Sequence, residues 1–218
     1  MKITMYDLGI IYKQFFVISD LHLGINSSTI SNIVLKEMIS RVRSVIEKFN
    51  IKTVIINGDL KHSINILKPY ELEHVKTFLN KIDSNVILIK GNHDAILDKH
   101  IPMLNEYKID NVIITHGHKI INAKKGFYIL GHAHPYIKIR DEIGSIARFK
   151  VFIKHKDFII LPTYNPIIWG EDIFTKQLII PNIQEKLNDS DIFIAHENEY
   201  ALKIGRFKHI YSSKKSSI

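Results

Sequence analysis

The chain of 218 residues contains no cysteine. Without thiols it cannot form disulfides, hold a metal through thiolate ligands or use a cysteine nucleophile. A metal site would have to be built from His, Asp and Asn side chains and water, which suit Mn, Fe, Zn, Ni or Mg better than softer ions. The cysteine count therefore restricts the chemistry of any metal site before a motif is considered.

Long apolar runs are also missing. No stretch approaches the roughly 20 apolar residues that a helix needs to cross a bilayer. The first twelve residues alternate and include Asp7, which is unlike a signal peptide. We therefore expect no membrane segment and a cytoplasmic location.

Acidic residues are fewer than basic ones, 22 against 30, which gives a net charge of +8 and a pI of about 9.4. A basic surface attracts polyanions, including nucleic acids and smaller phosphate-bearing substrates. Solubility and compositional bias explain the same excess equally well. The charge alone thus leaves nucleic-acid binding and an ordinary basic surface as equal alternatives.

In the first half, short runs rich in Ile and Val alternate with segments of helical periodicity. The expected strands are 1–6, 14–19, 53–57, 85–89, 111–115 and 127–130, and the expected helices are 29–49, 69–82 and an interrupted one at 97–107. A turn is expected around Asp7-Leu8-Gly9, between the first two strands. The alternation predicts an α/β sheet with right-handed crossovers.

After Pro135 the pattern changes to strands, which indicates a second sheet packed on the first. Strands are expected at 136–140, 148–154 and 157–161, and a hairpin at 191–196 and 200–204. The segment 162–184, with the only tryptophan, Trp169, has no clear pattern. We expect one domain over 1–211 and a polar tail over 212–218. The edge of the C-terminal hairpin could pair with a second copy in a homodimer.

Polar side chains of metal-ligand type follow five of the apolar runs. In chain order they are Asp20 and His22, Asp59, Asn92 with His93 and Asp94, His116 with His118, and His132 with His134. Glycine precedes three of these groups, which allows sharp turns and a close approach of the backbone. Each pattern is weak alone, but together they have about the number and type of ligands that two divalent ions sharing a carboxylate need.

The ordered series Asp20-x-His22, Gly58-Asp59, Gly91-Asn92-His93-Asp94, His116-Gly117 and Gly131-His132-x-His134 resembles the calcineurin-like metallophosphoesterase superfamily. This resemblance implies an αββα sandwich with two packed mixed sheets and a dinuclear metal site at the strand ends. The short N-terminal strands, the Gly-Asp-Leu-Lys-His form of the second motif and the compact length are most similar to the archaeal SbcD-related phosphoesterases.

The resemblance also implies a role for each residue of the motifs. Asp20, His22 and His134 would bind one ion, Asn92, His116 and His132 would bind the other, and Asp59 would bridge both. Mn²⁺ is the first expectation, with Fe, Zn, Ni or Mg as alternatives. Two ions about 3.5–4 Å apart can bind a phosphoryl oxygen and activate a water for attack on phosphorus.

Two further residues of the third motif are expected to assist catalysis. His93 would protonate the leaving oxygen or stabilise its charge, and Asp94 would bond the His93 ring and fix its tautomer. Asp94 could equally cap a local turn. His62 and His118 are left open between the surroundings of the metal site and ordinary surface. The remaining histidines have no motif context, and we expect His74 on the surface.

The function predicted is a metal-dependent phosphoesterase, a hydrolase whose substrates are phosphate esters. One hypothesis is a phosphodiesterase or nuclease acting on DNA or RNA. The resemblance implies that related DNA nucleases usually add a capping domain after the last metal motif. Here only 84 residues follow His134 and the second sheet should use most of them, so a nuclease of this form would have an open site or need a partner. The alternatives are a phosphomonoesterase or small-molecule phosphodiesterase, and a metal-binding partner subunit with little activity.

Overall fold

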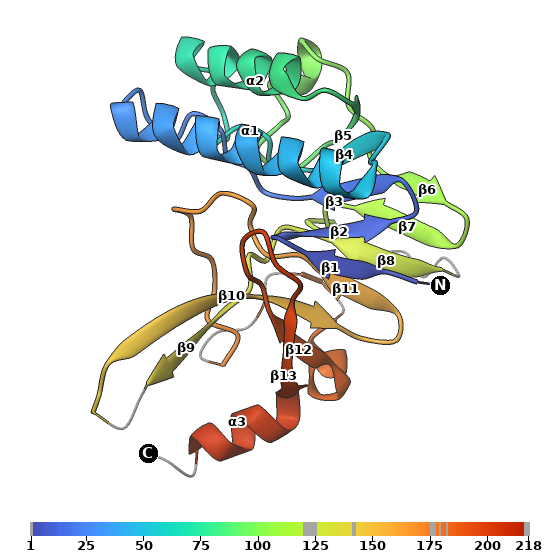
Figure 1. Cartoon of the computed structure of the whole chain (residues 1–218), viewed down its shortest axis with the longest axis vertical. Coiled ribbons are helices and arrows are strands. Elements are labelled where there is room, and N and C mark those ends of the chain that lie inside the picture. The colour runs from blue at the N-terminus through green and yellow to red at the C-terminus, as the bar shows by residue number, and fades with distance from the viewer. Residues whose placement is uncertain are drawn as a thin grey trace.

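Two mixed β-sheets pack against each other in the computed structural model, and two long helices cover the outer face of the first sheet (Figure 1). The structure describes residues 2–119, 126–140, 143–174, 178, 180–181 and 183–215. The predicted α/β fold with two packed mixed sheets is confirmed. Among the described residues, no helix is both long and apolar enough to span a bilayer.

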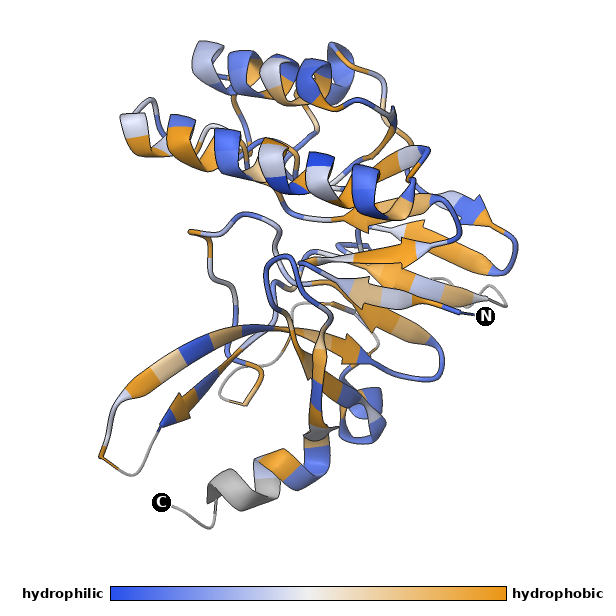
Figure 2. Cartoon of the chain, viewed as in Figure 1, coloured by the Kyte–Doolittle hydropathy of each residue, from blue (hydrophilic) through white to orange (hydrophobic). Residues whose placement is uncertain are grey.

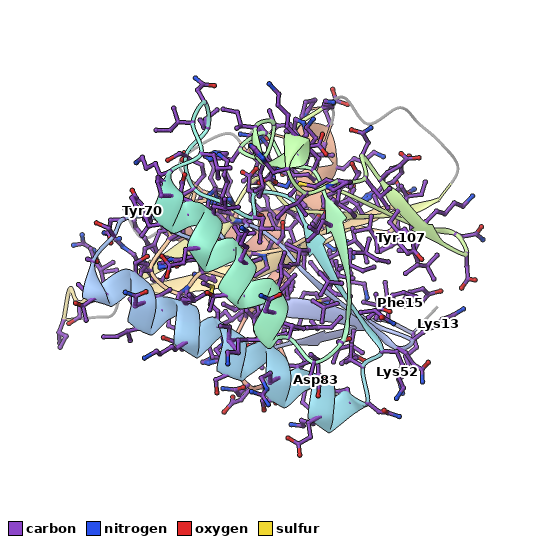
Figure 3. All side chains as sticks on the ribbon, turned by 90° about the horizontal axis from the view of Figure 1, so that it is seen from above. Lys13, Phe15, Lys52, Tyr70, Asp83 and Tyr107 are labelled. Carbon is purple, nitrogen blue, oxygen red and sulfur yellow. The ribbon has the colours of Figure 1, made fainter. Side chains whose placement is uncertain are left out.

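In the first sheet, the buried strands lie next to the two long helices. It contains β1 (Thr4–Tyr6), β2 (Gly9–Tyr12), β3 (Phe15–Ile18), β4 (Thr53–Asn57) and β5 (Asn85–Ile89), in that spatial order. β3, β4 and β5 are parallel, and α1 (Thr29–Phe49) and α2 (Pro69–Lys81) connect them. Figure 3 shows the two helices side by side above the strands. Val17, Ile18, Val54 and Ile55 are fully buried, as expected of strands covered on both faces.

The second sheet is larger and supplies the strands of the second half. Its order is β13 (Leu202–Arg206), β12 (Asp191–Ile194), β10 (Ile146–Lys154), β11 (Phe158–Ile160), β8 (Phe127–Leu130), β7 (Val112–Thr115) and β6 (Tyr107–Ile109), and β9 (Tyr136–Arg140) pairs with β10. Ile114, Ile129 and Phe152 share one core cluster with the first sheet. Because β13 lies at one end of the sheet, the edge that the homodimer hypothesis requires is present.

The outer face of the second sheet is covered mainly by irregular chain. A separate core cluster joins this face to Ile173, Ile180, Leu187 and Phe207. Leu187 belongs to the short helix η2 (Gln184–Asp189), and Phe207 begins α3 (Phe207–Lys215). The fourth layer of the sandwich is therefore much thinner than the layer formed by α1 and α2.

Several elements differ from those predicted. The N-terminal segment forms three strands, because β2 follows a turn in which Asp7 has φ +58° and its buried carboxylate accepts hydrogen bonds from Arg41. The expected helix at 97–107 is only the short helix η1 (Leu97–Lys99), and β6 follows it. α3 extends into the expected tail as far as Lys215, and residues 216–218 lie outside the described ones.

The tip of the β12–β13 hairpin contacts the first turn of the chain. The Asp7 N–H donates to Glu199 O at 2.8 Å, and the Asn198 N–H donates to Asp7 Oδ1 at 3.1 Å. The Arg41 guanidinium bonds Asp7 Oδ1 and also Glu197. These polar contacts join the turn after β1 to the turn between β12 and β13.

Candidate active site

The five polar strand ends converge at the carboxyl ends of β3, β4, β5, β7 and β8. Two groups of potential ligand atoms, each within 4.8 Å of one another, lie there. One group contains Asp20, His22, Asp59 and His134, and the other contains Asp59, His116 and His132. Asp59 is the only residue that the two groups share. The sequence predicted both groups, with Asn92 as a further member of the second.

The backbone at this site adopts unusual conformations. Five residues with side chains have left-handed φ angles, namely Asp20 (+59°), His22 (+44°), Asp59 (+49°), His132 (+68°) and His134 (+42°). Such conformations cost about 1–3 kcal/mol each and cluster at functional sites. Each produces a sharp turn directly after a strand, and the turns aim the side chains at a common centre.

Two glycines allow the backbone to pass close to the ligand-type side chains. A Cβ on Gly91 would lie 2.0 Å from Asp59 Oδ1, and a Cβ on Gly58 would lie 2.2 Å from His116 Nδ1. Gly58 also has φ +84°, which a residue with a Cβ adopts at a cost. The glycines of the motifs are thus required by contact with Asp59 and His116.

Asp20 is fully buried among donors. Its Oδ2 accepts from Ser19 Oγ at 2.6 Å and from the His132 N–H at 3.0 Å, and its Oδ1 lies 2.9 Å from His134 Nε2. Burial would raise the pKa of the Asp20 carboxyl, but the facing His134 and His116 rings outweigh it and hold that pKa well below its usual range. Asp20 therefore keeps its negative charge inside the protein.

The first group is suited to a divalent cation. His22 Nε2 and His134 Nε2 lie only 3.3 Å apart and face the carboxylates of Asp20 and Asp59. Burial, followed by the neighbouring His134, lowers the pKa of His22 to about 3, so this ring is neutral. Imidazole nitrogens that converge on buried carboxylates match the ligand preference of first-row metal ions.

The second group is organised around His116. Its Nδ1 lies 2.9 Å from Asn57 O, to which it donates, so that Nε2 faces Asn92 Oδ1 at 3.2 Å and Asp59 Oδ1 at 3.4 Å. Burial would lower the pKa of His116, but the carboxylates of Asp20 and Asp59 outweigh it and raise the pKa to about 9. A cation bound here would be attracted by the same two carboxylates, and Asn92 is placed to join its ligands.

His93 lies at the edge of the first group. Its ring Nδ1 donates to the main-chain oxygen of His62, its Nε2 lies 3.6 Å from Asp59 Oδ2, and its N–H donates to Asp59 Oδ1 at 2.9 Å. The side chain is 18% exposed, so it can contact both solvent and a bound substrate. The contact with the main-chain oxygen of His62 fixes the tautomer of the His93 ring, a role that was expected of Asp94.

Asp94 acts on the backbone. Its buried carboxylate accepts N–H groups of Gly91 at 3.0 Å, Leu60 at 3.1 Å and Lys61 at 3.4 Å. The expected bond to the His93 ring is wrong, because His62 supplies the partner of that ring. Asp94 instead ties together the loops that carry Asp59 and Asn92, which is closer to the turn-capping alternative.

Both histidines that the sequence left open lie beside the two groups. The His62 ring centroid is 5.5 Å from that of His22, and the His118 ring centroid is 5.3 Å from that of His116. Burial and the nearby His116 lower the pKa of His118 to about 4, so this ring is neutral. A role of either ring in the surroundings of the metal site stays a prediction.

One histidine placed on the surface by the sequence is buried. His74 is 6% exposed, and its Nε2 lies 2.9 Å from Asn32 Oδ1 between α2 and α1. The expectation of a surface position is therefore wrong. His74 joins the two helices and lies outside both ligand groups.

Residues that the sequence patterns did not identify hold the site in place. Thr163 Oγ1 donates to Asp20 O at 2.8 Å, and Asn165 Nδ2 donates to Leu21 O at 2.8 Å. Asn57 Nδ2 crosses to the second sheet and donates to Thr115 O at 3.0 Å. The sequence signal that could have identified Asn57 was its position just before Gly58-Asp59, at the end of an apolar strand.

Comparison with known proteins gives one family match. The family described as calcineurin-like phosphoesterase matches residues 13–206. No curated protein sequence matches the chain. A crystal structure of the *Pseudomonas putida* nuclease MPE is similar, with TM-score 0.64, 19% identity and coverage of 91% of this chain and 93% of that one.

A second similar structure is that of YfcE, a phosphoesterase from *E. coli*, with TM-score 0.45, 14% identity and coverage of 88% of this chain and 98% of that one. At these identities, similarity to solved structures concerns at most the fold. The family match is stronger, because it covers most of the chain and includes all the strand ends that converge at the site. The chain therefore belongs to the calcineurin-like phosphoesterase family, whose members are metal-dependent hydrolases.

Proposed function

We propose that this protein is a phosphodiesterase that cleaves nucleic acid with two divalent ions, Mn²⁺ foremost. The observation that carries the proposal is the pair of ligand groups that share Asp59. Asp20, His22 and His134 would hold one ion, and Asn92, His116 and His132 the other. When bound, such a pair supplies a site for the phosphoryl oxygen and an activated water.

His93 is proposed as the group that assists the leaving oxygen. Its Nδ1–H is engaged by His62 O, so the proton available for transfer is the one at Nε2. Asp59 Oδ2 lies 3.6 Å from that nitrogen. Partial exposure lets the nitrogen contact a substrate oxygen while the ring stays fixed.

The basic charge and the fold together support nucleic acid as the proposed substrate. The net charge of +8 attracts a polyanion over distance and strengthens its binding. The *P. putida* protein of similar fold is a nuclease, and we extend that activity to this chain as part of the proposal. Membership of the SbcD-related group is likewise proposed, on the form of the motifs at Asp20 and Asp59.

The alternatives use the same centre. A phosphomonoesterase or a small-molecule phosphodiesterase would need the same ligand groups and His93. A metal-binding subunit with little activity would not need His93 to be fixed by His62 O beside Asp59. That arrangement favours an active enzyme over the third alternative.

The test supplies metal-loaded protein with three substrates: bis-p-nitrophenyl phosphate, p-nitrophenyl phosphate and single-stranded DNA. We expect cleavage of the diester and of DNA, loss of both activities after EDTA treatment and recovery with Mn²⁺. Cleavage of the monoester alone would contradict the nuclease proposal. Cleavage of none, with two ions bound per chain, would contradict both enzyme hypotheses.

A further inference from the structure

A β-hairpin leaves the active site directly after the last ligand-type histidine. β9 begins two residues after His134 and pairs with the first half of β10, and the hairpin extends away from the body of the protein (Figure 1). Polar and apolar residues alternate along it (Figure 2). The hairpin therefore begins beside the candidate metal site, and one of its faces runs from Tyr136 to Arg140.

That face carries aligned positive charges. Lys138 lies directly opposite Arg148, and Arg140 lies two residues beyond Lys138 on the same face of the strand. Lys138 Nζ lies 5.8 Å from the Tyr136 ring centroid, which places both side chains on this face. Like charges directly opposite each other destabilise a sheet, so the pairing of Lys138 with Arg148 is not explained by stabilisation of the hairpin.

Trp169 lies at the base of the same face. Its ring centroid is 5.7 Å from that of Tyr136, and Lys150 Nζ, on the strand opposite Tyr136, is 5.6 Å from the indole. The indole is 40% exposed although it is the only tryptophan of the chain. A large aromatic ring at the surface beside cations is the usual composition of a surface that binds single-stranded nucleic acid.

The loop that carries Trp169 is fixed against the site. A Cβ on Gly170 would lie 2.1 Å from His134 O and 2.2 Å from His134 Cβ, so the loop backbone contacts His134 directly. Asn165 anchors the start of the loop through its bond to Leu21 O. Trp169 therefore lies one residue from the backbone contact with His134, in a loop that Asn165 anchors at its start.

We propose that Trp169, Lys138, Arg140 and Arg148 form a strand-binding surface for single-stranded nucleic acid that leads out of the active site. One base stacks on the indole, and the phosphates that follow lie along the three cations. The inference rests on the proposed function, because it specifies which form of nucleic acid reaches the metal centre. A paired base cannot offer its face to the indole, which favours single strands over duplexes.

The length of the surface limits the number of nucleotides that it binds. From Tyr136 to Arg140 the strand rises about 13 Å. The next two residues, Asp141 and Glu142, are acidic and lie outside the described residues. The basic run ends there, so the surface accepts a few nucleotides only.

The single tryptophan provides a direct test, because its fluorescence reports on Trp169 alone. The Mn²⁺-loaded full chain is mixed with oligothymidylate or oligouridylate in a stopped-flow instrument, and emission is recorded before cleavage proceeds. We expect saturable quenching by single strands, weaker quenching by a duplex and none by inorganic polyphosphate, which has charge but no bases. Comparison of the two oligonucleotides distinguishes DNA from RNA.

Variants separate stacking from charge. Trp169→Leu should weaken binding of a fluorescein-labelled oligothymidylate about tenfold, the loss of one stacked base. Arg140→Ser with Arg148→Ser should reduce the slope of log affinity against log salt by about 1.4, or about 0.7 for each cation. The matched control is Arg43→Ser with Lys52→Ser, which removes the same charge from two exposed residues, one on α1 and one directly before β4. Both line one hollow with Asn85 at the amino end of β5, and Figure 3 labels Lys52.

The outcomes distinguish this inference from the proposed function. Cleavage of DNA without quenching, and with unchanged binding by Trp169→Leu, would overturn the strand-binding surface alone. Quenching and weakened binding without any cleavage of DNA would support the surface and contradict the nuclease proposal. A change in Trp169 emission that follows protein concentration without nucleic acid would overturn the inference, because the face would then bind a second copy of the chain.

Discussion

The two sheets contribute different chemistry to the active site. The first sheet supplies both carboxylates, Asp20 and Asp59, together with His22, Asn92 and His93. The second supplies only imidazoles, from His116, His132 and His134. The negative charge that attracts a cation thus comes from one sheet, and the other completes the ligand set with imidazole rings. Metal affinity should therefore depend most on the first sheet.

The geometry nevertheless depends on the register between the sheets. Asn57 Nδ2 bonds Thr115 O and Ile129 O, and Tyr164 N–H bonds Ser19 O at 2.9 Å, so hydrogen bonds cross between the sheets beside the ligands. Buried bonds of this kind are costly to leave unmade. These hydrogen bonds consequently hold the imidazoles of the second sheet in one position relative to the carboxylates of the first.

Asp59→Ala is the strongest test of the difference between the two sheets. Because Asp59 alone belongs to both groups, we expect both ions to be lost and cleavage of bis-p-nitrophenyl phosphate to fall at least about a thousandfold. Metal content by mass spectrometry and the rate of hydrolysis measure the two effects. Asp83→Ala, at an exposed residue just beyond the C-terminal end of α2, is the matched control (Figure 3). Full metal occupancy in Asp59→Ala would refute the shared role.

His93→Gln should separate catalysis from metal binding within the first sheet. We expect two ions to remain and the rate of DNA cleavage to fall about 10²–10⁴-fold. The loss should be smaller for bis-p-nitrophenyl phosphate, since p-nitrophenolate leaves without a proton. His100→Gln, an exposed histidine outside the two ligand groups, provides the control. Equal losses on both substrates would argue against proton transfer by His93.

The sequence predicted the convergence because the fold places successive strand ends at one edge. Asp20, Asp59 and His116 each follow an apolar strand, so their proximity follows from parallel pairing and from packing of two sheets. The glycines before Asp59 and Asn92 were recognised as turns. A close approach of the backbone was expected at both, and the coordinates add what each glycine approaches: His116 for Gly58 and Asp59 for Gly91.

Other features could not be predicted from side-chain patterns in the sequence. His62 fixes His93 through a main-chain oxygen, which every residue has, so no residue type signals it. Asp94 is adjacent to His93 in sequence, yet the turn directs its carboxylate to backbone amides. β2 was missed because its run after Asp7 is short and the turn is stabilised by Arg41, 34 residues away. Contacts across such distances depend on tertiary packing.

The smallest expected effect concerns the one lysine buried in the second sheet. Lys150 is 7% exposed on β10, and its ammonium donates to the main-chain oxygens of Thr163 and Asn165. Burial, with a further contribution from Arg41, lowers its pKa from 10.5 to about 7. The second sheet therefore holds a cation that loses its proton easily in the folded state, in contrast with the carboxylates of the first sheet, which keep their charge.

Between pH 7 and 10.5 the unfolded chain holds a proton at Lys150 that the folded chain releases, so this residue makes the free energy of unfolding rise with pH. From pH 7 to pH 9 the rise should be about 1–2 kcal/mol in the wild type relative to Lys150→Met. Urea unfolding at the two pH values measures it, and subtraction of the variant removes the titration of His116 and other groups. Lys154→Met, exposed at the end of the same strand, should behave as the wild type. The difference in the free energy of unfolding between the wild type and Lys150→Met could instead be equal at the two pH values. That result would mean that Lys150 keeps its proton, and that the second sheet retains a buried positive charge opposite the carboxylates of the first.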